Sequence, residues 1–235
     1  MRAHSTIVFL GAVVCAASVL AYGQTGTAQA PEQGQAPVPH SGVETDIGFN
    51  FYEAINSTTT AKGVIQTPTN SPGGMFEIRQ IRKPLIGYEI TYSYNPAGET
   101  IAPTPAPSCG SNCNTPPQSL PSGGSTLGLD WVISHKFGAL RPFAAGGLGF
   151  LFDDPSYGVT VGQTAAVNNT YGSNNVNRPA WLYGGGVDFA VSQHWGFRAQ
   201  YRGSIYRVPN LSTMYPALGV DTQTRMPMGG IFFAF

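Results

Sequence analysis

Apolar and polar residues alternate with a period of two along residues 180–206. Trp181 and Phe189 stand at odd positions, whereas Asp188 and several glycines fill the even ones. After a three-residue turn at residues 192–194 the alternation resumes, with aromatic residues again on one face and arginines on the other. Side chains point alternately to the two faces of a β-strand. The segment is therefore predicted to be a hairpin of two roughly ten-residue strands, with one apolar and one charged face.

The same alternation recurs along the rest of the chain. It predicts six further strands, at residues 43–52, 75–82, 86–94, 125–134, 140–152 and 224–235. In the second of these, Ile81 falls out of phase, which indicates either a bulge or a misplaced boundary. The polar stretches 53–74, 95–124, 153–179 and 207–223 are predicted loops. The stretch 95–124 contains seven prolines and is predicted to hold no strand.

Short and long connections alternate along the chain. Those at residues 83–84, 136–139 and 192–194 are short, and the other four are long. This alternation is typical of up-and-down outer-membrane barrels, which have short periplasmic turns and longer extracellular loops. The sequence therefore predicts an all-β fold, an eight-stranded antiparallel transmembrane β-barrel. An even number of strands places both ends of the barrel on the periplasmic side.

Composition is consistent with this fold and excludes one class of partner. With 235 residues, 30 of them glycine and 19 proline, the chain is expected to form one turn-rich domain. The formal net charge is zero, and only 10% of the residues are charged. Nucleic acid is therefore not an expected partner, because binding it requires a basic surface.

The first residues have the pattern of an export signal. Arg2 precedes a mostly apolar run at residues 7–20, and small residues follow at 21–23. A second possible cleavage position follows Ala30. A membrane anchor is the alternative, but the run is shorter than the roughly twenty residues that a spanning helix needs. We predict a signal peptide at residues 1–23, a flexible periplasmic lead-in at 24–42 and the barrel domain at 43–235.

Nine charged residues share the face that carries the small residues. They are Glu44, Asp46, Glu77, Arg79, Glu89, Asp130, Asp188, Arg198 and Arg202. If that face met lipid, each basic residue near the bilayer midplane would cost about 2–4 kcal/mol. We therefore predict that the charges point into the lumen, which in an eight-stranded barrel is just wide enough for side chains. Their predicted role is a structural charge network, with a proton or ion path as the alternative.

A resemblance to a known family rests on the hairpin and on the last residue. The run GGGVDFAVSQHWGFRAQYRG resembles the penultimate hairpin of the outer-membrane β-barrel superfamily typified by the transmembrane domain of outer membrane protein A and by its small relative OmpX. In that family a glycine-rich strand with an inward acid and a strand of R-x-x-Y-R type recur, and Asp188, Arg198, Tyr201 and Arg202 occupy those places. Phe235 resembles the signature that the barrel assembly machinery recognises.

The resemblance covers residues 43–235, and one residue of the last strand departs from the family pattern. Pro227 lies in the last predicted strand, where a closed barrel offers no free edge to accommodate a missing amide donor. The family implies a location in the bacterial outer membrane, with outer-membrane lipid as a partner.

Catalytic and cofactor chemistry is not expected. Beyond the signal segment, the histidines are His40, His135 and His194, one in the lead-in and two in predicted periplasmic turns. Barrel hydrolases carry a catalytic histidine near the extracellular rim, so acyl or peptide hydrolysis lacks its general base here. We therefore predict no enzyme activity, no cofactor and no metal site.

Two cysteines lie close together in the longest predicted loop. Cys109 and Cys113 are predicted to form a disulfide, because export favours oxidation. A metal or redox pair is the alternative, although two cysteines without a nearby histidine make a poor zinc site.

The function expected from these observations lies at the cell surface. A monomeric barrel with a filled lumen suits a structural role, with loops that contact an extracellular glycan or protein in adhesion or envelope interactions. A narrow pore for ions or small solutes, as in the porin family, is one alternative. A soluble lipocalin-like barrel that binds an apolar ligand is another, and it would require the bulky face inside.

Overall fold

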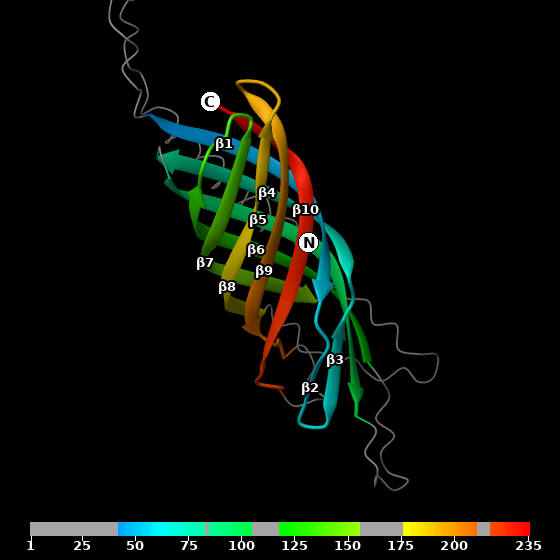
Figure 1. Cartoon of the computed structure of the whole chain (residues 1–235). Coiled ribbons are helices and arrows are strands. Elements are labelled where there is room, and N and C mark those ends of the chain that lie inside the picture. Colours follow the sequence, from blue (N-terminus) through cyan, green and yellow to red (C-terminus); the bar gives the residue numbers. More distant parts are fainter. Residues whose placement is uncertain (1–41, 83–84, 105–117, 156–175, 211–216) are drawn as a thin grey trace, which may run out of the picture. The chain divides into compact units, whose positions relative to one another are not determined.

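A computed structural model of the chain describes residues 42–82, 85–104, 118–155, 176–210 and 217–235, and these form a closed antiparallel barrel (Figure 1). Its eight long strands are β1 (Val43–Asn56), β4 (Ser71–Arg82), β5 (Ile86–Pro103), β6 (Gln118–Ser134), β7 (Leu140–Pro155), β8 (Val176–Ala190), β9 (Trp195–Arg207) and β10 (Asp221–Ala234). Two short strands, β2 (Thr59–Ala61) and β3 (Val64–Pro68), form a hairpin between β1 and β4.

Each long strand pairs with its neighbours in chain order, and β1 pairs with β10 to close the sheet. The prediction of an eight-stranded antiparallel barrel is therefore confirmed. Among the described residues, no helix has the length and apolar character needed to cross a membrane.

The two ends of the barrel differ in how the strands are joined. Residues 135–139 connect β6 to β7, and residues 191–194 connect β8 to β9; we call this the short-turn end. The amides of Val191 and Ser192 both donate to the carbonyl oxygen of Trp195, and Gly138 supplies a positive φ in the other turn. At the opposite long-loop end, β2 and β3 extend past the end of β1 (Figure 1).

The two faces of the strands follow the alternation read from the sequence. In β1, Asp46 and Asn50 are fully buried in the lumen, whereas Phe49 and Phe51 are exposed on the outer wall. In β4, the ladder to β1 runs without interruption through Ile81, whose side chain is buried on the lumen face. The bulge, one of the two explanations considered, is therefore absent from this pairing, and Ile81 is an apolar residue that lines the lumen.

The strands are longer at the long-loop end than the sequence predicted. The expectation that 95–124 holds no strand is wrong, because β5 continues to Pro103 and β6 begins at Gln118, with Pro96 opposite Gly123. The predicted loop at 53–74 is also partly wrong, since it contains β2, β3 and the start of β4. Strand β4 pairs with β5 only as far as Tyr94, and β3 pairs with residues 99–103 of β5 beyond that point. Proline lacks only the donor, so these ladders keep the carbonyl acceptors.

Proline 227 is accommodated at an interruption in the closing ladder. It pairs with Tyr201 on β9, but the register between β1 and β10 passes from Tyr52↔Met228 to Ile55↔Arg225. Pro227 has no partner on β1, so its missing amide donor falls where the ladder is already broken.

Close approach of the backbones requires glycine at some lumen positions. A Cβ added to Gly147 on β7 would overlap the backbone carbonyl oxygen of Leu129 on β6. At the adjacent Gly146 the nearest heavy atom to such a Cβ is 3.8 Å away. Gly147 therefore has no room for a side chain, whereas its neighbour Gly146 on the same strand has room for one.

We expect Gly147→Ala to destabilise the barrel by about 1–3 kcal/mol, because the methyl group would force the β6 and β7 backbones apart. Gly146→Ala is the matched control and should change the free energy of unfolding by less than about 0.5 kcal/mol. Denaturant unfolding of the two variants in lipid vesicles measures this difference. Equal stabilities would show that the close approach at Gly147 is unimportant.

Candidate functional site

The outer wall of the barrel is apolar. Its exposed side chains include Phe49, Phe51, Trp131, Ile133, Leu148, Phe150, Trp181, Phe189, Phe197, Tyr201 and Ile231. On β9 the exposed apolar side chains run from Trp195 to Ile205. Ten residues at about 3.4 Å each, tilted by 35–45°, cover about 25 Å along the barrel axis. This is the height of the apolar band of a transmembrane barrel.

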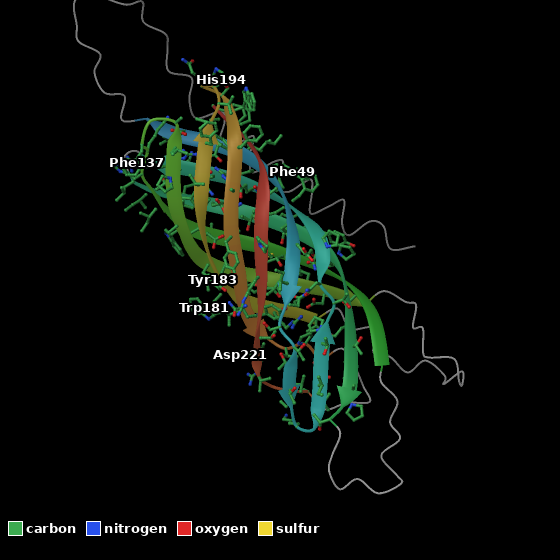
Figure 2. The ribbon with its side chains drawn as sticks, turned by 45° about the vertical axis from the view of Figure 1, so that its right-hand side comes forward. Phe49, Phe137, Trp181, Tyr183, His194 and Asp221 are labelled. Carbon is green, nitrogen blue, oxygen red and sulfur yellow. The ribbon has the colours of Figure 1, made fainter. Side chains whose placement is uncertain are left out.

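Aromatic side chains stand near both edges of this band. Figure 2 shows Phe137 and His194 at the short-turn end, and Trp181 and Tyr183 towards the opposite end. Trp181 is 68% exposed and Phe137 is 62% exposed, although both have large apolar surfaces. Rings at two levels are typical of the two interfaces of a membrane with water.

The lumen holds a connected network of charged side chains. Eight of the nine predicted residues are buried there; the ninth, Glu44, is partly exposed, with its side chain 18% accessible. Arg141 joins them, so that six carboxyl groups meet four guanidinium groups. The charged residues come from β1 and from every strand from β4 to β9. The network therefore links strands that are distant around the barrel wall.

Arg198 is the most connected member of this lumen charge network. Its Nε donates to Asp188 Oδ1 at 2.6 Å, and its Nη2 donates to Asp46 Oδ1 at 3.0 Å. Its Nη1 pairs with Glu77. Three carboxylates on three strands thus depend on one guanidinium group that is 1% exposed.

Arg141 makes a second junction close to the first. Its Nη1 donates to Glu44 at 2.6 Å, its Nη2 to Asp46 at 2.9 Å and its Nε to Asp188 at 2.9 Å. Asp46 and Asp188 therefore each bridge Arg141 and Arg198.

The remaining two arginines extend the network towards the long-loop end. Arg79 Nε donates to Glu89 at 2.6 Å, and Arg79 Nη1 donates to Asp188 at 3.3 Å. Arg202 pairs with both Glu89 and Asp130. Charge-assisted bonds of this kind are strong where water is excluded.

Two aromatic rings inside the lumen were not predicted. Phe143 lies 4.0 Å from the guanidinium carbon of Arg79, and Phe232 lies 5.0 Å from that of Arg198, as measured to the ring centroids. Both rings therefore offer cation–π contacts to buried arginines. The sequence offered a signal for Phe143, which shares the parity of Arg141 on β7, but none for Phe232, because the charged residues of β10, Asp221 and Arg225, have the opposite parity and are exposed.

The other predicted site residues lie apart from the network. Phe235 is at the short-turn end, where its amide donates to Thr45 O at 3.0 Å and its ring is 69% exposed. Cys109 and Cys113 lie outside the described residues. Their disulfide remains a prediction.

A second polar cluster lines the lumen at the long-loop end, beyond the apolar band. It comprises Gln66, Glu99, Asp153 and Arg178, which we call the mouth cluster. Gln66 Nε2 donates to Glu99 Oε1, and Arg178 pairs with Asp153. The sequence interpretation missed this cluster because all four residues lay in predicted loops. The signal was the continued parity of β5, where Glu99 shares the inward face with Glu89.

Burial raises the pKa of Glu99 to about 7, against the smaller opposing effects of the Gln66 hydrogen bond and the Arg178 charge. The folded state therefore holds this proton more tightly than the unfolded chain. Folding stability should fall as pH rises from about 4.5 to about 7, and the full cost should be present above pH 7.

Glu99→Gln should remove this pH dependence. At about pH 8 we expect the variant to be more stable than the wild type by an amount on the order of 3 kcal/mol. Near pH 4.5 the two should be about equal, since the glutamate is then protonated in the folded state and about half protonated in the unfolded chain. Urea unfolding at the two pH values tests this. A wild type and variant that respond equally to pH would contradict the buried state of Glu99.

A solved structure shares this architecture. The crystal structure of the outer membrane protein OprG from Pseudomonas aeruginosa matches with a TM-score of 0.59, covering 83% of this chain and 97% of OprG at 12% sequence identity. The chain has the fold of an outer-membrane β-barrel. The resemblance to eight-stranded outer-membrane barrels is thus confirmed at the level of the fold.

Other outer-membrane barrels match less closely. Neisserial surface protein A has a TM-score of 0.48 at 10% identity, covering 82% of this chain and 97% of its own. The attachment invasion locus protein Ail of Yersinia pestis, solved with the heparin analogue sucrose octasulfate, has a TM-score of 0.44 at 12% identity with the same coverage. No protein-family model and no curated protein matches the sequence.

Proposed function

We propose that this protein is a structural, surface-exposed barrel of the bacterial outer membrane. Its lumen is closed by paired charges, and its long-loop end contacts an extracellular glycan or protein. In this proposal a signal peptide directs its export, and the barrel assembly machinery inserts it by recognising a signature that includes Phe235. Its role requires no enzyme activity.

The observation that carries the proposal is the filled lumen. Arg198 and Arg141 together hold Asp46, Asp188, Glu77 and Glu44 across the narrow interior. Side chains that bridge the lumen leave the outer wall and the loops as the surfaces through which the barrel acts. The apolar band of about 25 Å supports a membrane location.

The long-loop end supports a role in contact with other molecules. The β2–β3 hairpin and the extended ends of β5 and β6 lie beyond the apolar band, and so would stand clear of lipid. Segment 105–117 connects β5 to β6 and is rich in small and polar residues. Surface loops on a rigid scaffold are common sites of binding.

Location and fold are tested together by fractionation and a heat-shift gel. The protein should remain with the outer membrane and migrate faster on a denaturing gel when unboiled than when boiled. A soluble protein without a heat shift would overturn the proposal and favour the lipocalin-like alternative.

Surface contact is tested on whole cells that express loop variants. Replacing residues 105–117 with a short Gly-Ser linker should reduce binding to glycan arrays or to matrix-coated plates, and the heat-shift gel should be unchanged. Replacing residues 156–175 in the same way is the matched comparison, because it changes a different long connection. Unchanged binding for both variants would contradict a contact role for these loops.

A narrow pore is the second candidate, favoured by one observation. Asn50 is fully buried in the lumen, and neither its Nδ2 nor its Oδ1 has a hydrogen-bond partner. Gln200 Oε1 is also unpaired. Buried polar groups without protein partners are the groups that water inside the lumen would satisfy. Single-channel recording in a planar bilayer separates the two functions: discrete current steps would favour the pore, and a silent bilayer the closed barrel.

A further inference from the structure

A polar cavity of about 70 Å³ lies inside the long-loop end of the barrel. On the lumen face of β5, Glu89 belongs to the charge network, Ser93, Asn95 and Glu99 line the cavity, and Ile101 belongs to an apolar cluster beyond it. That cluster also contains Val64, Val208 and Leu218. The cavity is therefore placed between paired charges on one side and an apolar cap on the other.

Two buried charged groups in this cavity have an atom without a partner. Glu99 is 4% exposed, and its Oε2 accepts no hydrogen bond, although Oε1 is paired with Gln66. Arg178 is 7% exposed, and its Nε donates to no acceptor. In the described part of the chain no ion pair joins Glu99 to Arg178. One free acceptor and one free donor therefore belong to residues that line the same cavity.

The rest of Arg178 is fixed. Its Nη1 donates to Arg207 O at 2.7 Å, its Nη2 pairs with Asp153, and its guanidinium carbon lies 5.1 Å from the ring centroid of Tyr206. The guanidinium group cannot turn to satisfy Glu99 without losing these contacts. A buried carboxylate without a complete set of donors is costly, so a bound donor would be stabilised there.

The size and lining of the cavity define the solute. A water molecule needs about 10–15 Å³ of such a cavity, so about 70 Å³ has room for roughly five water molecules. This volume suits a solute of about four or five non-hydrogen atoms. Hydroxyl and amide side chains surround it, including those of Asn56, Ser93, Asn95, Thr126, Ser204 and Thr224.

We propose that this cavity is a binding site for a small hydroxylated primary amine. The ammonium group donates to Glu99 Oε2, and the hydroxyl oxygen accepts from Arg178 Nε. The neutral hydroxyl and amide groups of the lining accept and donate the remaining hydrogen bonds. The residues named for this site all lie in strands, so it is tested separately from the proposed surface role of the loops.

Binding of an ammonium group should depend on pH through Glu99. The charged and titratable groups that face it from the neighbouring strands are Asp153, Arg178 and Tyr206. Because burial raises the pKa of Glu99 to about 7, the carboxylate is available above that pH and is lost below it. Affinity should therefore rise with pH, which is the opposite of the direction expected for an anionic ligand at Arg178.

Ethanolamine is the probe, and ethylene glycol is the matched compound without the ammonium group. Isothermal titration of the refolded protein in micelles at about pH 8 should give saturable binding of ethanolamine, at least about tenfold weaker at pH 5.5, where the amine is still protonated but Glu99 is not ionised. Ethylene glycol should bind at least tenfold more weakly than ethanolamine at pH 8.

Variants identify the site. Glu99→Gln should abolish both the binding at pH 8 and its pH dependence, whereas the matched change Glu53→Gln, at an exposed position on β1, should leave them unchanged. The heat-shift gel verifies that each variant is folded. If Glu99→Gln does not refold, the binding of the two compounds to the wild type at the two pH values still tests the proposal. No saturable binding at pH 8, or equal binding of ethylene glycol, would overturn the proposal.

Discussion

Arg198→Leu is expected to destabilise the barrel by about 3–5 kcal/mol, because the substitution leaves buried carboxylates without their partner. Arg198 binds Asp46, Glu77 and Asp188 at once, and all three carboxyl groups are almost completely buried. Removing one partner of a buried ion pair costs far more than removing both. The effect should therefore be a large fraction of the total stability of the domain.

Chemical unfolding in lipid vesicles, followed by the heat-shift gel, measures this loss. Arg225→Leu is the control, since Arg225 is exposed on β10 and its loss should change stability by less than about 0.5 kcal/mol. Arg198→Lys should fall between the two, because lysine restores the charge without the forked geometry. A stability of Arg198→Leu within 1 kcal/mol of the wild type would show that the lumen charge network is not structural.

Leu148→Arg should destabilise the barrel by about 2–4 kcal/mol in a bilayer, because it places a charge in the apolar band. Leu148 is 50% exposed on the outer wall and lies opposite Leu129, which is also exposed. Both positions are near the middle of their strands. An arginine here could reach water only by distorting the barrel or thinning the membrane.

The matched change Thr60→Arg places the same side chain on β2, outside the apolar band, and should have little effect. Unfolding of both variants in vesicles gives the comparison. Leu148→Arg should also insert into vesicles more slowly than Thr60→Arg. Equal stability and equal insertion would mean that the wall around Leu148 does not face lipid.

The period of two was enough to predict the barrel and the side on which its charges lie. It worked best at the short-turn end, where strands β5 and β9 begin at the predicted residues Ile86 and Trp195. Turns of a few residues fix the register of two adjacent strands. Alternation then propagates that register along the strand, so the inward parity of Asp188 and Arg198 followed directly.

The long-loop end could not be predicted in the same way. Prolines and glycines in 95–124 indicated a loop, but β5 continues because both β3 and β6 supply ladder partners. Such partners are remote in sequence, so local propensity does not reveal them. The mouth cluster was missed for this reason, since Glu99 and Arg178 belong to those strand extensions.

The sequence also could not predict which lumen residues contact one another. Parity places Arg198 and Glu77 on the same face, but their contact spans strands β9 and β4, which are not neighbours in the sheet. Contacts across a barrel depend on its stagger and diameter. The rule that bulky residues face outward failed at Phe143 and Phe232, because buried guanidinium groups also need apolar and π surfaces around them.

Quenching of tryptophan fluorescence by brominated lipids tests the orientation of the wall most directly. All three tryptophans of the chain, Trp131, Trp181 and Trp195, are on the outer wall and are 62%, 68% and 43% exposed. In vesicles, lipids brominated along their acyl chains should quench most of the emission, and aqueous iodide should quench little. Strong quenching by iodide with none by the brominated lipids would contradict an apolar outer wall that contacts the membrane.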